Sequence, residues 1–401
     1  MTSNNTFGEL GLSIIGLGAQ YPPNKLKPDE LAKLAAKFHP KSPAMEKVLS
    51  INRFTGIETR SSIGTSEHPL VNNAAPPSIA DLHATFMSDG VPLAVNAARK
   101  ALAEARLDVS QITHVVSTTC TDSANPGFDH YVAKELGLLP SVEKVLLHGV
   151  GCAGGLAALR TAANLALGHR FRGGRRVFYV VIPDTEGDLG FDADPLGWKV
   201  VLSQRVPKMT EQVLEPAFSD LMASIGHHLP ETYQTPPDFD WAMHPGGLTI
   251  LTNAERTLKI SAEHMRASYH RYMEHGNSSS ATIFSVMDHL RSKEMDSYAP
   301  DGRIKEYVVG CAFGPGISVE MCMLKRNMGA RGIQTPPETD SEASRSEGGE
   351  EDDRDWPSLD GETQTCHTPG ELPPEPTRDA EATITDEEGF IIEALAGVEL
   401  D

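Results

Sequence analysis

The chain has 401 residues, of which 39% are hydrophobic and 28 are prolines. That length is sufficient for two packed halves or for one large domain. The net charge of −20 is concentrated near the C-terminus: residues 331–401 hold 21 Asp and Glu against 4 Arg, so residues 1–330 carry only about −3. Neither part has the basic face that nucleic-acid binding requires, and we expect no nucleic-acid partner.

Membrane, secretory and disulfide-rich classes are also disfavoured. No apolar run approaches the ~18 residues of a membrane-spanning helix, and Met1–Leu10 lacks the basic-then-apolar layout of a secretory signal. We therefore expect a soluble cytoplasmic protein without membrane contact. The cysteines are scattered and form no CxxC pair, which predicts neither a disulfide scaffold nor a metal site. They are Cys120, Cys152, Cys311, Cys322 and Cys366.

In the first half, residues 1–182, strand and helix signals alternate. Leu93–Leu107 has helical periodicity, and Ile112–Thr119 is typical of a buried strand. Lys144–His148 predicts a second strand, which runs into glycine-rich residues 149–155. The apolar stretch Leu156–Leu167 predicts a central buried helix, and Arg176–Val181 predicts a third strand.

In the second half, residues 183–328, the alternation continues. Asp238–Met243 predicts a strand that ends at His244. Helical patterns follow over 250–274 and 279–290, and two strands are predicted at 306–311 and 317–322. Two α/β halves with reactive residues at strand ends form an architecture in which loops carry the chemistry.

Residues 329–401 form a separate segment rich in Pro, Glu, Asp, Ser and Thr. Such a composition buries too little apolar area to offset the entropy of ordering, so we expect a disordered acidic tail. Gly389–Ala396 is either a short docking helix or a frayed end.

Cys152 is the first candidate catalytic residue. It lies where a strand turns through Gly149-Val-Gly into a helix, and a helix N-terminus favours a thiolate over a thiol. The glycines let the backbone approach an acyl group. The alternative, a buried inert cysteine, describes Cys311 and Cys322 better, since both lie in predicted strands.

Two further residues complete the candidate site. His244 ends a strand and is followed by Pro245-Gly-Gly247, a rigid turn that leaves space around the imidazole. Asn277 lies between two helical patterns, in Gly276-Asn-Ser-Ser-Ser-Ala281. Local pattern alone fits equally well with Asn277 as the N-cap of the next helix.

Four motifs in order resemble the type III polyketide synthases, the chalcone and stilbene synthase family, and especially its fungal members. They are Gly149-Val-Gly-Cys-Ala-Gly-Gly155, Trp241-Ala-Met-His-Pro-Gly-Gly247, His275-Gly-Asn-Ser-Ser-Ser-Ala281 and Phe313-Gly-Pro-Gly-Ile-Ser-Val-Glu320. The resemblance covers residues 11–328 and implies a thiolase-like fold, with two related α/β halves in an αβαβα arrangement. The His-Pro-Gly-Gly and Gly-Pro-Gly elements disfavour the ketoacyl carrier-protein synthases, which share the Cys/His/Asn trio.

The resemblance also implies the chemistry. Cys152 would take an acyl group from acyl-CoA, and malonyl-CoA would lose CO2 to give an enolate held by His244 and Asn277. Repeated extension and cyclisation would give pyrone- or resorcinol-type products. The enzyme would need no cofactor and would form a homodimer.

Further assignments rest on the same resemblance. Cys120, Thr121 and Ser279 would line the cyclisation pocket, and Asn125 would reach across the dimer interface. Phe313, Gly314 and Pro315 belong to the substrate loop, in which Ala312 replaces the usual glycine. Lys47 and Arg53 would bind the CoA phosphates.

One spacing departs from the family. His244 and Asn277 are 33 positions apart, as in the family, whereas Cys152 and His244 are 92 apart, roughly fifty residues too few. The shortage falls near residues 180–185, where the family has a helix, a Gly/Ser-rich turn and a core strand. Losing a strand would leave backbone groups unpaired and apolar surface uncovered.

Three explanations of the short spacing remain open: a skipped exon or gene-model error, a shortened form that still folds, and an inactive homologue. The rival functions are a carrier-protein-dependent ketoacyl synthase and a non-catalytic partner of an intact synthase subunit.

Overall fold

A computed structural model describes residues 12–38, 42–170, 189–195 and 197–328. The helices are α1 to α11, at Pro28–Phe38, Pro43–Phe54, Ile79–Thr85, Val91–Ala105, Phe128–Leu136, Gly154–Arg170, Val206–Ile225, Leu248–Leu258, Arg266–His275, Thr282–Leu290 and Lys293–Ser297. The strands are β1 to β9, at Asn24–Leu26, Arg60–Ser62, His114–Thr118, Glu143–Leu147, Leu189–Asp194, Gly197–Leu202, Asp240–Met243, Tyr307–Gly314 and Ser318–Lys325.

Most predicted elements are confirmed. The predicted strands at 112–119 and 144–148 are β3 and β4, and the predicted central helix is α6. The helical pattern over 250–274 is interrupted, because α8 ends at Lys259 in the left-handed conformation and a short 3-10 turn precedes α9. The predicted strand at 176–181, the region of the spacing deficit and the acidic tail lie outside the described residues.

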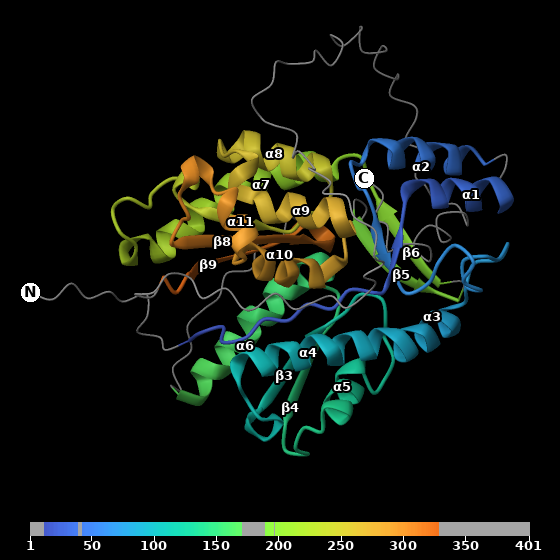
Figure 1. The fold of residues 1–401 in the computed structure, drawn as a ribbon, viewed down its shortest axis with the longest axis horizontal. Coiled ribbons are helices and arrows are strands. Elements are labelled where there is room, and N and C mark those ends of the chain that lie inside the picture. Colours follow the sequence, from blue (N-terminus) through green and yellow to red (C-terminus); the bar gives the residue numbers. More distant parts are fainter. Residues whose placement is uncertain (1–11, 39–41, 171–188, 196, 329–401) are drawn as a thin grey trace, which may run out of the picture. The chain divides into compact units, whose positions relative to one another are not determined.

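The second half is built on the sheet β7–β8–β9. β7 runs parallel to β8, and β8 runs antiparallel to β9. Successive side chains of β7 point to opposite faces, as the pleat requires. Trp241 and Met243 join a core with residues of α7 and α8, whereas Ala242 joins a core with α6 and α10. The sheet is therefore covered on both faces (Figure 1).

A second pairing, parallel β3–β4, lies on the other side of α6 (Figure 1). The start of α6 meets this sheet tightly, since a Cβ at Gly154 would lie 2.4 Å from Thr118 Oγ1. Helix α5 also packs on β3 and β4. The order of layers is thus helix, sheet, helix, sheet, helix, with the strand end before Cys152 next to the central helix.

The two sheets differ in burial. All eight residues of β8 are buried, whereas the five residues of β3 are only half-buried and two of β4 are exposed. Leu12, Ile14 and Ile15, near the first described residue, are 40%, 43% and 57% exposed. The apolar residues of the first half are therefore less completely covered than those of the second.

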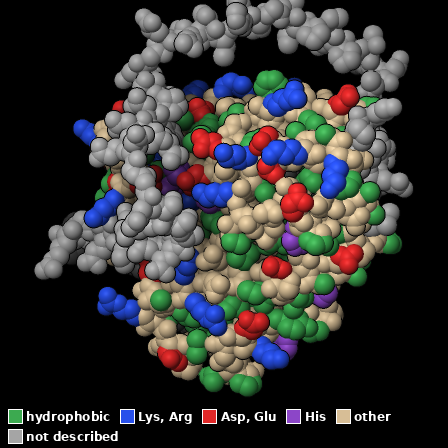
Figure 2. Space-filling model, turned by 45° about the vertical axis from the view of Figure 1, so that its right-hand side comes forward, with side chains coloured by type: hydrophobic (Ala, Val, Ile, Leu, Met, Phe, Trp, Pro, Cys, Tyr) green, Lys and Arg blue, Asp and Glu red, His purple; other side chains and the backbone are tan. Residues whose placement is uncertain are grey.

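Surface charge is mixed. Lysine and arginine side chains alternate with aspartate and glutamate on the face drawn in Figure 2, which shows no continuous basic stripe there. No helix in the described ranges combines the length and apolarity needed to cross a bilayer.

Candidate active site

The Cys152 turn requires glycine at Gly151. Gly149 and Gly151 both have positive φ, of 74° and 49°, and residues 151–153 form a 3-10 turn that leads into α6. A Cβ on Gly151 would lie 2.3 Å from Pro315 Cδ, so the chain before Cys152 packs directly on the 313–316 loop. Only glycine fits both the conformation and the space. Cys152 is 6% exposed.

The hydroxyl of Ser279 contacts two cysteine side chains beside this turn. Its Oγ lies 3.5 Å from the sulfur of Cys152 and 3.3 Å from the sulfur of Cys120. Ser279 itself has φ of 52°, an uncommon conformation for a residue with a side chain. Such strained residues cluster at functional sites. Cys120 and Ser279 therefore lie beside Cys152, and their place in a cyclisation pocket stays a prediction.

Asn277 uses both ends of its amide. Its Oδ1 accepts a hydrogen bond of 2.8 Å from the backbone N–H of Ser279, which opens the 3-10 turn before α10. Its Nδ2 donates to the carbonyl of Gly246 at 3.4 Å. Asn277 is not the N-cap, which is Ser278 for the 3-10 turn and Ala281 for α10, but its amide spans from the Ser279 turn to the His244 turn.

His244 is fixed by its backbone. It follows β7, and its N–H donates to the carbonyl of Cys311 on β8 at 2.8 Å. The side chain is 1% exposed, and within the described ranges neither ring nitrogen has a hydrogen-bond partner. A Cβ on Gly246 would lie 3.9 Å from Nε2, so the glycine leaves space beside the ring. Burial lowers the pKa of His244 to about 4, which makes the imidazole neutral at pH 7.

Phe313, Gly314 and Pro315 lie at and just after the end of β8, beside the Cys152 turn. Phe313 and Gly314 are buried. A Cβ on Gly314 would lie 2.3 Å from the carbonyl oxygen of Val150, which again joins this loop to the Cys152 turn. The chain then turns through Gly316 and Ile317, both with positive φ.

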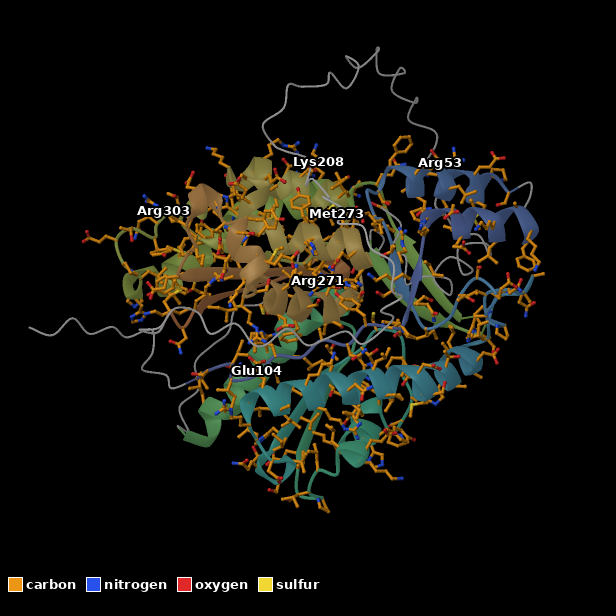
Figure 3. All side chains as sticks on the ribbon, in the orientation of Figure 1. Arg53, Glu104, Lys208, Arg271, Met273 and Arg303 are labelled. Atoms are coloured by element: carbon orange, nitrogen blue, oxygen red, sulfur yellow. The ribbon has the colours of Figure 1, made fainter. Side chains whose placement is uncertain are left out.

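The remaining predicted residues lie at exposed positions. Thr121 and Asn125 are exposed in the loop after β3, and the Asn125–Pro126 bond is cis. Lys47 and Arg53 are exposed on α2, with Arg53 in its last turn (Figure 3). The chain after α2 packs on α9, since the N–H of Glu58 donates to the carbonyl of Met273 at 2.9 Å.

Sequence reasoning missed His275, the residue before Gly276 and Asn277. Its ring stacks on Tyr21 with centroids 3.5 Å apart, and its Nδ1 lies 2.7 Å from Ser61 Oγ. Burial lowers the pKa of His275 to about 4. These contacts anchor the end of α9 from which Asn277 projects. No local pattern signals them, because Tyr21 and Ser61 are more than 200 positions away.

Sequence comparison shows the family of this chain. The N-terminal domain of chalcone and stilbene synthases matches residues 16–189, and the C-terminal domain matches residues 177–328. The chain is 35% identical to the type III polyketide synthase pspB of Penicillium soppii, over 79% of this chain and 96% of that enzyme. This chain belongs to the chalcone and stilbene synthase family. It is a type III polyketide synthase and hence an acyltransferase.

Solved structures agree with this family. The fungal type III polyketide synthase ORAS and a type III pentaketide synthase from Neurospora crassa each share 56% identity, with a TM-score of 0.76. Each match covers 79% of this chain and 100% of the other. A single-residue mutant of CsyB shares 29% identity with a TM-score of 0.72, over 78% of this chain and 99% of the other. The predicted thiolase-like α/β fold and the predicted enzyme class are confirmed.

Two of these alignments are longer than the part of this chain that they cover, so the relatives contain residues that have no counterpart here. The match to pspB extends over 394 residues, whereas 79% of the 401 residues of this chain is about 317. The match to the acylalkylpyrone synthase csyB of Aspergillus oryzae extends over 378 residues, again against 79% of this chain.

Proposed function

We propose that Cys152 accepts an acyl group from acyl-CoA and that this group is extended with malonyl-CoA. The thiolate attacks the thioester carbonyl, the carbon–sulfur bond to CoA breaks, and CoA leaves as a thiolate that takes up a proton from solvent. Malonyl-CoA then loses CO2, and the electron pair that remains forms an enolate. The enolate carbon attacks the Cys152 thioester, a carbon–carbon bond forms, and the thiolate is released. The extended chain is then a CoA thioester, and its return to Cys152 by the same thioester exchange begins the next round, so that each round adds two carbons.

His244 and Asn277 are proposed to hold the enolate oxygen. The observation that carries this proposal is the imidazole of His244, which is buried, neutral and without a hydrogen-bond partner in the described structure. The Asn277 amide bonds to Gly246, in the turn after His244, and to Ser279, whose hydroxyl contacts the sulfur of Cys152. Neutral N–H donors suit an oxyanion that develops during reaction. One such donor is typically worth about 3–4 kcal/mol of transition-state stabilisation.

The product class is proposed from the relatives. The relatives with named products include an acylalkylpyrone synthase and a pentaketide synthase, which supports cyclisation to pyrone- or resorcinol-type products. Cys120, Thr121 and Ser279 are proposed to shape the cyclising chain, with Phe313, Gly314 and Pro315 closing the pocket.

The proposed substrates are CoA thioesters, with no added cofactor. A CsyB structure holds CoA-SH, which supports CoA as the acyl carrier. Lys47 and Arg53, exposed on one helix, are the cations proposed for its phosphates. A cytoplasmic homodimer, with Asn125 near the interface, completes the proposal.

A non-catalytic form is the second candidate, and it rests on the spacing between Cys152 and His244. The half-buried β3–β4 pair and the excess of matched length in the relatives both support a missing segment near residues 180–185. In that case the chain would act as the partner of an intact synthase subunit.

The test is turnover by the purified 401-residue chain with a panel of acyl-CoAs and malonyl-CoA. The proposal predicts CO2 release and polyketide products by mass spectrometry, both lost in C152A and C152S. The matched control is C322A, because burial raises the pKa of that thiol to about 12 and keeps it inert. A cooperatively folded chain without products would support the non-catalytic form, and products only with carrier-bound malonate would indicate a ketoacyl synthase.

A further inference from the structure

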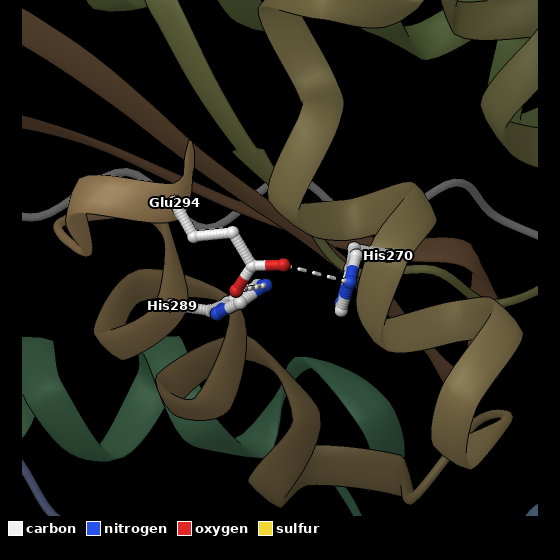
Figure 4. Close-up of side chains that lie close together, drawn as sticks. All are labelled: His270, His289 and Glu294. Carbon is white, nitrogen blue, oxygen red and sulfur yellow. Dashed lines mark ion pairs between the residues drawn. The ribbon is translucent and has the colours of Figure 1, made fainter. Parts of the chain in front are cut away.

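Outside the active site, three side chains with metal-binding chemistry converge where α9, α10 and α11 meet. His270 comes from α9, His289 from α10 and Glu294 from the first turn of α11 (Figure 4). The ligand atoms of all three lie within 4.8 Å of one another. We infer that these residues form a binding site for a divalent transition-metal ion, with Zn²⁺ as the best match.

The distances fit one shared ion. Nε2 of His270 lies 3.5 Å from one carboxylate oxygen of Glu294, and Nε2 of His289 lies 4.0 Å from the other. Tetrahedral Zn²⁺ binds nitrogen and oxygen at about 2.0–2.2 Å, which places its ligands about 3.3 Å apart. The widest separation among the three ligand atoms, 4.8 Å, would therefore have to close by about 1.5 Å, a movement shared between two side chains. Two imidazoles with a carboxylate are an established ligand set for zinc.

His289 supplies an independent observation. Its side chain is 7% exposed, and its Nε2 is buried without a hydrogen-bond partner in the described part of the chain. Buried polar atoms normally have partners, and a bound ion would provide one.

His270 is oriented for the same role. Oε2 of Glu274 lies 3.2 Å from its Nδ1, on the opposite side of the ring from Glu294, as an ion-pair contact that lacks hydrogen-bond geometry. A carboxylate behind a histidine is the usual outer contact of metal-binding imidazoles, since it fixes the ring and raises its basicity. Arg271 brings a positive charge, 3.1 Å from Glu274 Oε2, and the two carboxylates offset it.

The site has a structural consequence for Asn277. Helices α9 and α10 flank the loop that carries Asn277 and Ser279, and the proposed ion would tie both helices to α11. Metal binding would therefore order the support of that loop, at a distance from the reacting atoms, and the inference holds whether or not this chain makes polyketides.

The test uses the full chain, stripped with a chelator and dialysed against Zn²⁺ or Co²⁺. Metal analysis should give one ion per chain, and Co²⁺ should show the visible absorption of a nitrogen- and oxygen-ligated tetrahedral ion. E294Q and H270Q should bind at least about tenfold more weakly. The matched control E231Q, an exposed glutamate elsewhere, should bind as the wild type does.

Thermal unfolding separates loss of the site from loss of the fold. Without metal, E294Q and the wild type should melt alike, and Zn²⁺ should raise Tm in the wild type and E231Q but not in E294Q. Equal Zn²⁺ affinity in E294Q, H270Q and the wild type would overturn the inference. So would a cobalt spectrum with a thiolate charge-transfer band that disappears in C152A, because the ion would then lie at the active site.

Discussion

At the residue scale, the decisive property of His244 is that it is neutral and inaccessible to solvent. Burial disfavours the imidazolium, so the pKa falls from 6.5 to about 4. A neutral ring still has one N–H to donate, which is what an enolate oxygen needs. The same burial makes protonation of the folded state costly, and this gives a test that is independent of substrate.

Stability should fall with acid because of His244. The folded state binds the proton less readily than the unfolded state, so this contribution is complete above pH 6.5 and is lost as pH falls toward 4. Between pH 7 and pH 5 the loss is about 2 kcal/mol. Urea unfolding of H244Q should show a pH dependence weaker by that amount. H227Q, at an exposed histidine, should retain the wild-type dependence, and an unchanged slope in H244Q would contradict the assignment.

Candidate catalytic residues could be predicted from the sequence where the local pattern around a reactive side chain is distinctive. Cys152, His244 and Asn277 each follow a strand or helix end with glycine nearby, and the resemblance joined them. The His270, His289 and Glu294 cluster escaped prediction because its members come from three helices, without the cysteine spacing that usually signals zinc. Only the packing of α9, α10 and α11 brings them together.

At the element scale, the Cys152 turn depends on two separate demands on Gly151. The positive φ excludes ordinary side chains, and Pro315 occupies the place of a Cβ. G151A should therefore lose more stability than the roughly 1–2 kcal/mol of the left-handed conformation alone, and should also lose activity. Urea unfolding and turnover measure the two effects.

Gly137 offers the matched control. It has φ of 72°, yet a Cβ there would meet nothing within 4 Å. G137A should cost about 1 kcal/mol and leave turnover unchanged. Equal losses in G137A and G151A would mean that contact with Pro315 has no part in shaping the turn.

The sheet that carries His244 depends on a buried charge network. Arg266, 2% exposed, donates to both carboxylate oxygens of Asp240, at 2.8 and 2.9 Å, and Arg326 donates to one of them at 2.7 Å. D240N would leave two guanidinium groups poorly paired, and should lower the free energy of unfolding by about 3–5 kcal/mol. The comparison is E30Q, which breaks the exposed pair with Lys33 and should cost less than about 1 kcal/mol. Similar losses in both would contradict this reading.

At the scale of the whole molecule, the two sheets should differ in local stability. β8 is buried throughout, whereas β3 is half-buried. Amide hydrogen exchange reports such differences, because poorly covered elements open more readily. Peptides from β7, β8 and β9 should exchange more slowly than peptides from β3 and β4. Equal protection would count against a missing segment in the first half.

The alternation of strands and helices was sufficient to predict an α/β fold, and the motifs specified which one. Pattern could not predict the break between α8 and α9, which depends on one left-handed residue at Lys259. Nor did it predict the β5–β6 hairpin, which follows the region of the spacing deficit. The domain division at residues 182 and 183 stays a prediction.

The central claim is that Cys152 carries the growing acyl chain. The most direct measurement is mass spectrometry of the intact 401-residue chain after incubation with an acyl-CoA, followed by peptide mapping. We predict a mass increase of one acyl group, located on the peptide that contains Cys152 and absent from C152A. An unmodified Cys152, or an acyl group on another cysteine in the folded wild-type chain, would contradict it.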